Sequence, residues 1–539
     1  MAHLRRTPAA VAVDVGSTTC KAAVIDLAGG VLGLARREVA PSYPRPGWAE
    51  IDPERWWEAA ADVLRRAAAQ ASARGGWEPL GLAVTGQMHA PVLLDERGQA
   101  VCPAQLWLDQ RSAEEAARLW SEAAEPLRRA MGRPLGTSHT APKLRWLAVH
   151  HPEALSRARW LLLPKDFVRY RLTGEAATDA SDAGGTGMFA SDAAEWRAEL
   201  VHACGVRSEI MPPILPATAV AGRLTPAAAA ATGLPSGLPV MVGASDTRTT
   251  LLGSGVPEIA PICLYLGTAA WIAWVKRGAV APAGQGAADP VRTYVTIERW
   301  AATGTAGGAF HWVSGLFGER AGRGEDRFRE DAAAGPAPEP PESDYAALEA
   351  MAAAVPAGSD GVCFVPHLMG TRGRQPNPRA RAAWAGLTLA HGPGHLVRAC
   401  LEGVAFAVRS LCEQNGLAAD APALPAVVVG GGARGRLWRQ ILATALARPL
   451  WTTRVPEAGL VGAAAIAAVG VGACPDLATA VSRLVHAAER IEPVGDWLAA
   501  SEEAYSRYQR LERALTPLGA DAAAAPAAGA QDPRGARAG

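Results

Sequence analysis

The chain has 539 residues, of which 49% are hydrophobic, and its 53 basic residues nearly balance its 52 acidic ones. This length exceeds what a single hydrophobic core organises, so we expect two large domains. The balanced charge gives no indication of a nucleic-acid or membrane-surface partner and favours a small, neutral or modestly charged substrate. No stretch approaches the ~20 consecutive apolar residues that a membrane-spanning helix requires.

Eight cysteines are scattered along the chain, without a CxxC pair or a Cys/His cluster at zinc-ligand spacing. We therefore expect reduced thiols and a cytoplasmic protein. The first ten residues, MAHLRRTPAA, run directly into an apolar segment and lack the apolar core and cleavage site of a signal peptide.

The first motif lies at residues 11–26, VAVDVGSTTCKAAVID, where two apolar runs are joined by a polar turn. The pattern predicts two strands and a connecting turn. Asp14 and the turn residues Gly16, Ser17 and Thr18 offer a carboxylate, hydroxyls and backbone N–H groups to one point, which suits a phosphate and its metal ion. An ordinary hairpin has the same pattern, so the motif needs support from the rest of the chain.

The next segments predict a strand at 31–39 and a helix from Pro53 to Arg74, which begins after the N-cap residue Asp52. A short buried strand is expected at 80–84 and a further strand at 91–94.

The segment between these two strands carries Gln87, Met88 and His89. It follows the carboxyl end of a strand, where α/β sheets usually bind ligands. Taken singly, Met88 is more often a core residue and His89 more often a hydrogen-bonded structural residue.

Three later segments of the first half also contain polar residues. Asp109 and Arg111 are expected to hold a loop rather than to contact a ligand. Residues 138–171 predict helices with breaks. The glycine-rich segment 178–189, TDASDAGGTGMF, reads either as a surface loop or as a wall of a substrate cleft, and we favour the surface loop for its individual aspartates.

A second strand–turn–strand pattern marks the other half of the chain. The apolar run 240–245 ends at Asp246, which reads either as a functional carboxylate or as a helix cap. At 262–275, ICLYLGTAAWIAWV, the opening pattern recurs around Gly267 and Thr268. The recurrence indicates duplication of one fold, with the two turns facing each other across a cleft.

The remaining segments complete a second α/β unit. The sequence predicts a glycine-rich segment at 303–310 that includes Gly308, a mobile insertion at 318–343, a helix at 392–410, and a disordered tail at 516–539.

Near the end of this unit, a buried strand at 426–429 leads into Gly430, Gly431, Gly432 and Ala433, and a helix follows at 437–447. A strand, a glycine run and a helix N-terminus suit an anionic or nucleotide ligand, although many loops have a similar pattern.

In combination these motifs resemble the FGGY family of carbohydrate kinases, and within it the xylulokinase branch. The resemblance extends from about residue 10 to 485 and is carried by DVGSTTCKAAVID, PRPGWAEIDPERWW, GLAVTGQMHAPVLLD, WLDQRS, APKLRWL, LLPKDFVRYRLTGEAATDASDAGGTGMF, VGASDT, LYLGTAAW and VVGGGARGRLWRQILA.

The resemblance implies an α/β fold with two actin-like (ribonuclease-H-like) domains and a cleft between them. We expect a sugar-binding domain at 8–246 and an ATP-binding domain at 247–490. ATP and Mg²⁺ are then the expected cofactors and a small sugar the acceptor. A homodimer is left open.

The resemblance also implies a role for each matching residue. Asp14 is expected to place Mg²⁺ and the phosphates together with Gly16, Ser17 and Thr18, and Asp246 to accept the proton of the attacking hydroxyl. Sugar contacts are expected from Gln87, Met88, His89 and Asp246. Phosphate and adenosine contacts are expected from Gly267, Thr268, Gly308, Gly431, Gly432 and Ala433.

Three departures from the usual xylulokinase pattern bear on the sugar. Ala90 stands in place of a glycine, Ala244-Ser245-Asp246-Thr247 in place of Gly-Gly-Asp-Asn, and 370–374 (GTRGR) in place of Gly-Glu-Arg-Thr-Pro. D-xylulose remains the leading acceptor. The alternatives are ribulose, gluconate or a tetritol, or a non-catalytic actin-like regulator that responds to a sugar.

Overall fold

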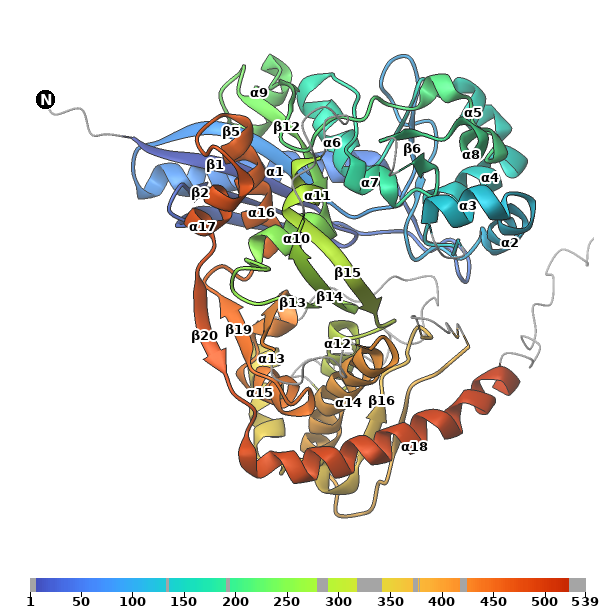
Figure 1. Cartoon of the computed structure of the whole chain (residues 1–539), viewed down its shortest axis with the longest axis vertical. Helices are drawn as coiled ribbons and strands as arrows, with labels where there is room; N and C mark the ends of the chain where they lie inside the picture. The colour runs from blue at the N-terminus through green and yellow to red at the C-terminus, as the bar shows by residue number, and fades with distance from the viewer. Residues whose placement is uncertain are drawn as a thin grey trace, which may run out of the picture.

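The computed structural model describes residues 6–131, 135–190, 194–278, 289–317, 342–371, 377, 379–416 and 424–522. Each half of the chain forms one six-stranded mixed sheet, and Figure 1 shows the first sheet in the upper part of the view and the second sheet below it. Among the described residues, no helix is long and apolar enough to cross a membrane.

The first sheet has the strand order β11-β12-β5-β1-β2-β3. In it β1 pairs antiparallel with β2 and parallel with β5, and β5 pairs parallel with β12. Its strands are β1 (Thr7–Val15), β2 (Thr19–Asp26), β3 (Val31–Glu38), β5 (Trp77–Gly86), β11 (Val220–Arg223) and β12 (Pro239–Ser245).

The second sheet has the order β15-β14-β13-β18-β19-β20. It repeats the directions of the first, since β13 pairs antiparallel with β14 and parallel with β18, and β18 pairs parallel with β19. The duplication predicted from the two turns is therefore confirmed. The strands are β13 (Ile262–Leu266), β14 (Ala270–Arg277), β15 (Val295–Ala302), β18 (Ala426–Val429), β19 (Leu450–Thr453) and β20 (Ala487–Ile491).

Helices cover the sheets and fill the insertions between strands. In the first half they are α1 (Pro53–Arg74), α2 (Ala113–Glu122), α3 (Ala124–Met131), α4 (Thr140–His150), α5 (Pro152–Arg157), α6 (Pro164–Thr173), α7 (Ala180–Gly184), α8 (Ala198–Ala203), α9 (Pro226–Thr232) and α10 (Asp246–Gly253). In the second half they are α11 (Pro290–Tyr294), α12 (Gly307–Phe317), α13 (Glu342–Ala353), α14 (Pro393–Gln414), α15 (Arg436–Ala445), α16 (Ala458–Gly470), α17 (Leu477–Leu484) and α18 (Leu498–Ala522).

Shorter strands pair outside the two large sheets. They are β4 (Glu50–Ile51) with β7 (Ala104–Gln105), β6 (Val92–Leu94) with β8 (Trp160–Leu162), β9 (Phe189–Ala190) with β10 (Glu195–Trp196), and β16 (Cys363–Val365) with β17 (Ala383–Ala385).

The helix α1 begins and ends where its sequence predicts. Asp52 accepts a hydrogen bond from the Glu54 N–H, and Pro53 occupies the first turn, where its missing N–H costs no bond. Its apolar face, which includes Trp56 and Leu64, packs on the outer face of the first sheet. This burial against the sheet fixes the helix in place.

Side chains that alternate along the strands point to both faces of each sheet and form three hydrophobic cores, one on each outer face and one between the sheets. One face of β1 and its neighbours packs with α1 in the outer core of the first sheet, and Ile262, Leu264 and Leu266 of β13 pack with α14 and α15 in the outer core of the second. The opposite faces of both sheets, together with α10, α16 and α17, form one middle core. The two sheets therefore share a core through these helices.

The helix α16 comes from the second half of the chain but packs against β1, β5 and β12 of the first sheet. In Figure 1 it lies beside the blue strands at the start of the chain. It also crosses α10 at short range, since an added Cβ on Gly253 would overlap the Ala458 carbonyl oxygen and one on Gly462 would overlap the Thr249 carbonyl oxygen. Glycine at both positions allows the two helix backbones to touch.

The structure bears on three further sequence predictions. The helices with breaks predicted at 138–171 are confirmed as α4, α5 and α6, and the short strand β8 lies in the break between α5 and α6. The helix α18 continues to Ala522, so the disordered tail expected at 516–539 is wrong for residues 516–522, and residues 523–539 lie outside the described residues. The insertion expected at 318–343 also lies outside them, except for the first two residues of α13.

Candidate active site

Asp14, Gln87 and Asp246 come from three strands that run in parallel. Asp14 lies near the end of β1, Gln87 directly follows β5, and Asp246 directly follows β12. Register pairs Asp14 with Thr85, and Ser245 with Gly86, so these residues meet at the carboxyl edge of the first sheet.

The carboxylates of Asp14 and Asp246 influence each other's environment. Burial and the negative charge of Asp14 raise the pKa of Asp246 to about 7, against hydrogen bonds from Thr247 that lower it. Burial also raises the pKa of Asp14, and the charge of Lys21 opposes this rise. The pair thus forms a half-buried acidic site next to the first turn.

The turn after β1 is tied to the Gln87 segment through Ser17. The Ser17 hydroxyl donates to Gln87 Oε1 at 2.7 Å and accepts from Trp107 Nε1 at 2.9 Å. Gly16 closes the turn, because its N–H donates to the Thr19 carbonyl oxygen at 3.2 Å. Thr18 joins the neighbouring loop, since its carbonyl accepts from the Val39 N–H at 2.8 Å.

His89 is held in a defined orientation. Its φ of 77° lies in the left-handed region, which costs a non-glycine residue about 1–3 kcal/mol. The Thr140 hydroxyl and the Lys143 ammonium both donate to its carbonyl oxygen, at 3.1 and 3.3 Å. Its Nδ1 lies 2.9 Å from the Gly185 carbonyl oxygen, which can only accept, so Nδ1 carries a proton.

Lys143 is a buried neighbour of His89 that the sequence did not single out. Its side chain is fully buried, and burial lowers its pKa to about 7 against the raising effect of Asp109. The ammonium also donates to the Ser138 carbonyl oxygen at 2.8 Å. Its position in the motif APKLRWL marks a lysine on an otherwise apolar helix face, and that pattern is the signal that could have identified it.

The glycine sites of the second half meet at the end of β13. Thr268 accepts backbone hydrogen bonds from Ala306 and Gly308, at 2.8 and 2.9 Å, and Gly267 accepts one from Gly307 at 2.8 Å. An added Cβ on Gly308 would lie 3.1 Å from the Thr268 carbonyl oxygen. The turn and the start of α12 are therefore packed backbone to backbone.

The run from Gly430 to Ala433 lies beside this turn. Gly430 has a φ of 97° and follows β18, the parallel neighbour of β13. Gly431 to Arg434 form a short 3₁₀ helix. Gly432 packs against Leu266 and the ring of Trp438, whereas an added Cβ on Gly431 would meet no atom within 4 Å. Ala433 is buried.

The start of α16 connects the two groups of residues. Arg434 donates to Glu457 Oε1, directly before α16. Two residues further on, an added Cβ on Gly459 would lie 3.9 Å from Asp14 Oδ2. The glycine run of the second sheet and the carboxylates of the first are thus linked through one helix end.

Other predicted residues have structural roles. Arg111 pairs with Asp109 and Glu50, both at 2.8 Å, and lies over the ring of Trp48, while Asp109 accepts from the Ala49 N–H. The loop-holding role expected for Asp109 and Arg111 is confirmed.

The surface-loop interpretation of 178–189 is wrong. Asp179 and Asp182 are both 0% exposed, because the segment folds into α7 and is covered by neighbouring elements. The sequence favoured a loop because glycine and aspartate are typical turn formers, and it contained no sign of the buried lysine that α6 places beneath them.

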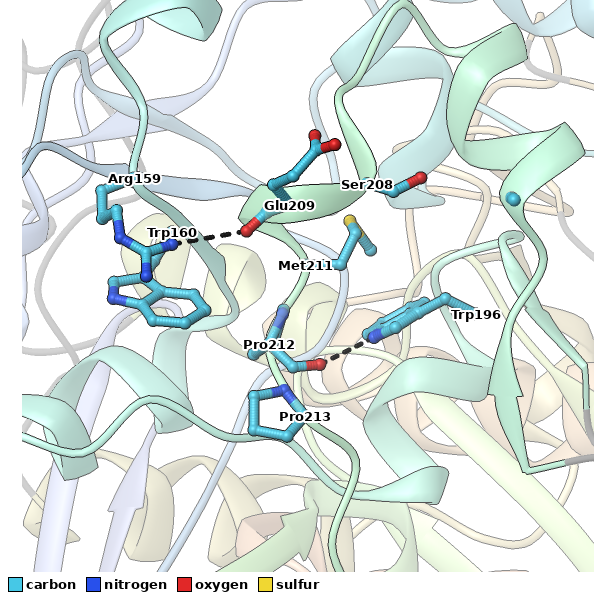
Figure 2. Close-up of a pocket in the computed structure, with 9 residues that line it drawn as sticks. Arg159, Trp160, Trp196, Ser208, Glu209, Met211, Pro212 and Pro213 are labelled. Atoms are coloured by element: carbon cyan, nitrogen blue, oxygen red, sulfur yellow. Dashed lines mark hydrogen bonds between the residues drawn. The ribbon is translucent and has the colours of Figure 1, made fainter.

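A hollow of about 470 Å³ lies on the first domain, away from these residues, and is lined by Arg159, Trp160, Trp196, Ala198, Ser208, Glu209, Met211, Pro212 and Pro213. Figure 2 shows two hydrogen bonds within its lining, since Arg159 donates to the Glu209 carbonyl oxygen and Trp196 Nε1 to that of Pro212. Its lining contains none of the residues described above.

Comparison with known proteins identifies both halves of the chain. Residues 9–253 match the N-terminal domain of the FGGY family of carbohydrate kinases, and residues 265–471 match its C-terminal domain. The xylulose kinase of Klebsiella pneumoniae is 32% identical over 80% of this chain and 84% of its own length. The xylulose kinase of Escherichia coli K12 is 29% identical over 94% and 99%.

Solved structures have the same fold. A xylulose kinase from Rhodospirillum rubrum is 30% identical, with a TM-score of 0.74 over 96% of this chain and 100% of its own. A gluconate kinase from Lactobacillus acidophilus matches with a TM-score of 0.76 at 21% identity, over 96% and 99% of the two chains, which shows the fold alone. With two six-stranded sheets of matching topology and both family domains in order, this chain belongs to the FGGY family of carbohydrate kinases.

Proposed function

We propose that the chain transfers the γ-phosphoryl group of ATP to the terminal hydroxyl of D-xylulose, which yields D-xylulose 5-phosphate and ADP. The observation that carries the proposal is the position of Asp246, a half-buried carboxylate with a pKa near 7 that lies beside Asp14. The segment of α7 connects it to His89, because the preceding residue, Ser245, donates to Ser181 of α7, and His89 Nδ1 donates to Gly185 directly after α7. Relatives named as xylulose kinases align along most of the chain.

Asp246 is the proposed general base. It accepts the proton of the sugar hydroxyl while that oxygen bonds to the γ-phosphorus and the bond from the γ-phosphorus to the β-phosphate oxygen breaks. Proton transfer to a positioned carboxylate contributes about 10²- to 10⁴-fold in rate. A carboxylate with a pKa near 7 is ionised in part at neutral pH and still basic enough to take the proton.

Asp14 fits the position of a Mg²⁺ ligand. The ion is usually held by one or two carboxylates together with substrate phosphates rather than by a protein cage. The described residues contain no cluster of three or more metal-ligating side chains, which agrees with a site of one or two carboxylates. Asp14 offers such a carboxylate, and its nearby opposite charge is that of Lys21. When bound there, Mg²⁺ would neutralise charge on the phosphates.

The remaining residues are assigned by position. Gln87, Met88 and His89 are proposed to contact the sugar, with His89 Nε2 accepting from a hydroxyl. Gly16 and Thr18 of the first turn, with Gly267, Thr268 and Gly308 of the second, are proposed to hold phosphates through backbone N–H groups and hydroxyls. Gly431, Gly432 and Ala433 are proposed to border the adenosine, because Gly431 leaves open space above the backbone.

The test measures sugar-dependent ADP formation with D-xylulose, D-ribulose, gluconate and a tetritol as acceptors. We expect the highest kcat/KM with D-xylulose. A higher value with another acceptor would reject D-xylulose but retain the kinase, and the changes at Ala90, Ser245 and Thr247 make this the informative comparison.

A variant separates chemistry from binding. Asp246→Ala is expected to lose nearly all transfer while its affinity for ATP, measured by calorimetry, stays within about twofold of the wild type, because the base contacts the acceptor rather than the nucleotide. Retention of most turnover would reject Asp246 as the base. ATP binding by the wild type without turnover for any acceptor would instead favour a regulator.

A further inference from the structure

A cluster of five charged side chains, all 0% exposed, lies beneath α7. The Lys165 ammonium is 2.6 Å from Asp166 Oδ1, 2.9 Å from Asp179 Oδ1 and 3.6 Å from Asp182 Oδ2. The fifth member is Arg169, whose guanidinium lies 3.6 Å from Asp166 Oδ1 and donates to the Ala177 carbonyl oxygen. We refer to these five charged residues as the buried cluster.

The buried cluster has one carboxylate more than its cations can balance. Lys165 and Arg169 supply two positive charges, whereas Asp166, Asp179 and Asp182 would supply three negative ones if all were ionised. An uncompensated charge in a site with no solvent contact is strongly unfavourable, so one carboxylate is expected to keep its proton.

Asp182 is the carboxylate that the geometry selects. Asp166 and Asp179 lie at hydrogen-bond distance from the Lys165 ammonium, and Asp179 also accepts from the Ser181 N–H at 2.7 Å. Neither oxygen of Asp182 has a hydrogen-bond partner among the described residues. Burial, opposed by Lys165, and the charges of Asp166, Asp179 and Asp246 raise the pKa of Asp182 well above its ordinary value.

The helix above the buried cluster contacts both sides of the active site. The Ser181 hydroxyl accepts from the N–H of Ser245, the residue before the base, at 2.9 Å. Gly185, directly after α7, accepts from His89 Nδ1 at 2.9 Å. An added Cβ on Gly185 would lie 2.6 Å from Met88 Cε, so the segment also packs closely on the residues assigned to the sugar.

We propose that Lys165 is a positioning residue that anchors α7, and through it Asp246 and His89, and that Asp182 stays a neutral acid so that the buried cluster adds no net charge beside the base. The chemical role rests on the proposed function, whereas the protonation state of Asp182 does not. An ionised Asp182 would place a further negative charge near Asp246 and would oppose ionisation of the base.

The first test reads the proton directly and needs no substrate. The infrared difference spectrum of wild type minus Asp182→Asn at pH 7.5 should contain the C=O stretching band of a protonated carboxylic acid. An ionised carboxylate band in its place would overturn the proposal. Asp95→Asn is the control, because Asp95 lies outside the buried cluster and hydrogen bonds from the backbone N–H groups of Gln99 and Arg97 hold its pKa below the usual value, so its removal should take away a carboxylate band instead.

The second test uses thermal unfolding, because the protonation state of Asp182 predicts the direction in which stability changes with pH. Folded Asp182 keeps its proton while the unfolded residue releases it, so wild-type stability falls as pH rises, by about tenfold in the unfolding equilibrium per pH unit. The amide that replaces the carboxyl group in Asp182→Asn has no proton to release, although the side chain is otherwise nearly isosteric. The excess Tm of Asp182→Asn over the wild type should therefore widen from pH 5 to pH 8, and a constant difference would overturn the proposal.

The third test measures kcat/KM as a function of pH, with the sugar acceptor that gives the highest turnover. Asp182→Asn should keep kcat/KM within about threefold and leave the midpoint of its acidic limb unchanged, because one neutral group replaces another. Lys165→Met should lower kcat/KM by at least tenfold and move that midpoint upward, because Asp166 and Asp179 lose their balancing charge. A downward shift of the midpoint in Asp182→Asn would show that Asp182 is ionised.

Discussion

At the scale of single residues, the pKa of Asp246 sets both how basic its carboxylate is and how much of it is ionised at neutral pH, and these two properties oppose each other. Burial and the neighbouring charge of Asp14 raise its pKa to about 7, which strengthens it as a base but leaves part of it protonated at neutral pH. A general base works best when its pKa lies close to the operating pH. With Asp246 as the proposed base, the site holds less ionised carboxylate at neutral pH, but that carboxylate is more basic.

This pKa predicts the pH profile of the free enzyme. We expect kcat/KM for the sugar to rise about tenfold per pH unit below pH 7 and to level off above it, because only the ionised form of Asp246 accepts the proton. Initial rates at saturating ATP and low sugar between pH 5 and 9 measure the profile. A profile that stays flat down to pH 5 would contradict the assignment.

Ser17 illustrates how a hydroxyl's partners narrow its role. The sequence suggested a phosphate contact, whereas in the structure the hydroxyl donates its single proton to Gln87 Oε1 and accepts from Trp107 Nε1 with one of its two lone pairs. We expect Ser17→Ala to raise the KM for the sugar about tenfold, as the loss of one or two hydrogen bonds would, and the KM for ATP less than twofold. An equal rise in both constants would restore Ser17 to the phosphate site.

At the scale of elements, the crossing of α10 and α16 depends on glycine. An added methyl on Gly462 would overlap the Thr249 carbonyl oxygen, whereas one on Gly459, a turn earlier on α16, would make ordinary contacts of 3.6 to 3.9 Å. Gly462→Ala should therefore destabilise the fold by about 1–3 kcal/mol. Gly459→Ala should leave stability unchanged or raise it by up to about 1 kcal/mol, since alanine favours the helix.

Denaturant unfolding of the two variants and the wild type measures the difference. Equal stability of the two variants would show that α16 shifts away from α10 at little cost, and that the crossing does not constrain the site.

Elements with a strong local pattern could be predicted from the sequence. The helix α1 has a proline in its first turn, a capping Asp52 and a periodic apolar face, and the prediction of 53–74 matches it. The strand β18 at 426–429 is equally well marked by a buried apolar run before glycines. The duplicated sheets could be inferred because both turns use the same residue types.

The environment of α7 could not be predicted in this way. Residues 178–189 carry turn-forming residues, and nothing local reveals that Lys165, distant along the chain, lies beneath Asp179 and Asp182. The hydroxyl network of Ser17 depends likewise on Gln87 and Trp107, 70 and 90 residues away. Contacts between distant segments decide these roles, and a local pattern does not contain them.

At the scale of the molecule, the first half of the chain does not complete its own domain. The inner face of the first sheet, which includes Ala12, Ile25 and Ala83, is covered by α10 and by α16 from the other half. We expect residues 1–253 alone to expose this face, to bind a hydrophobic dye and to self-associate.

Fusion of that fragment to residues 456–486 through a flexible linker should restore a monomer with little dye binding, because it returns α16 and α17 to the face. Gel filtration and dye fluorescence of the two proteins make the comparison. A monomeric, dye-free fragment without the fusion would show that the first domain is self-sufficient.

The place of α16 in the chain also sets an order of events during synthesis. About 200 residues separate the end of α10 from the start of α16, and at ~5–20 residues per second a ribosome needs on the order of 10–40 s to make them. Throughout that interval the first sheet has left the exit tunnel without the helix that covers its inner face. Its nascent form is therefore a client for chaperones, and pauses in translation between these two helices should lower the yield of folded enzyme more than equal pauses after α16.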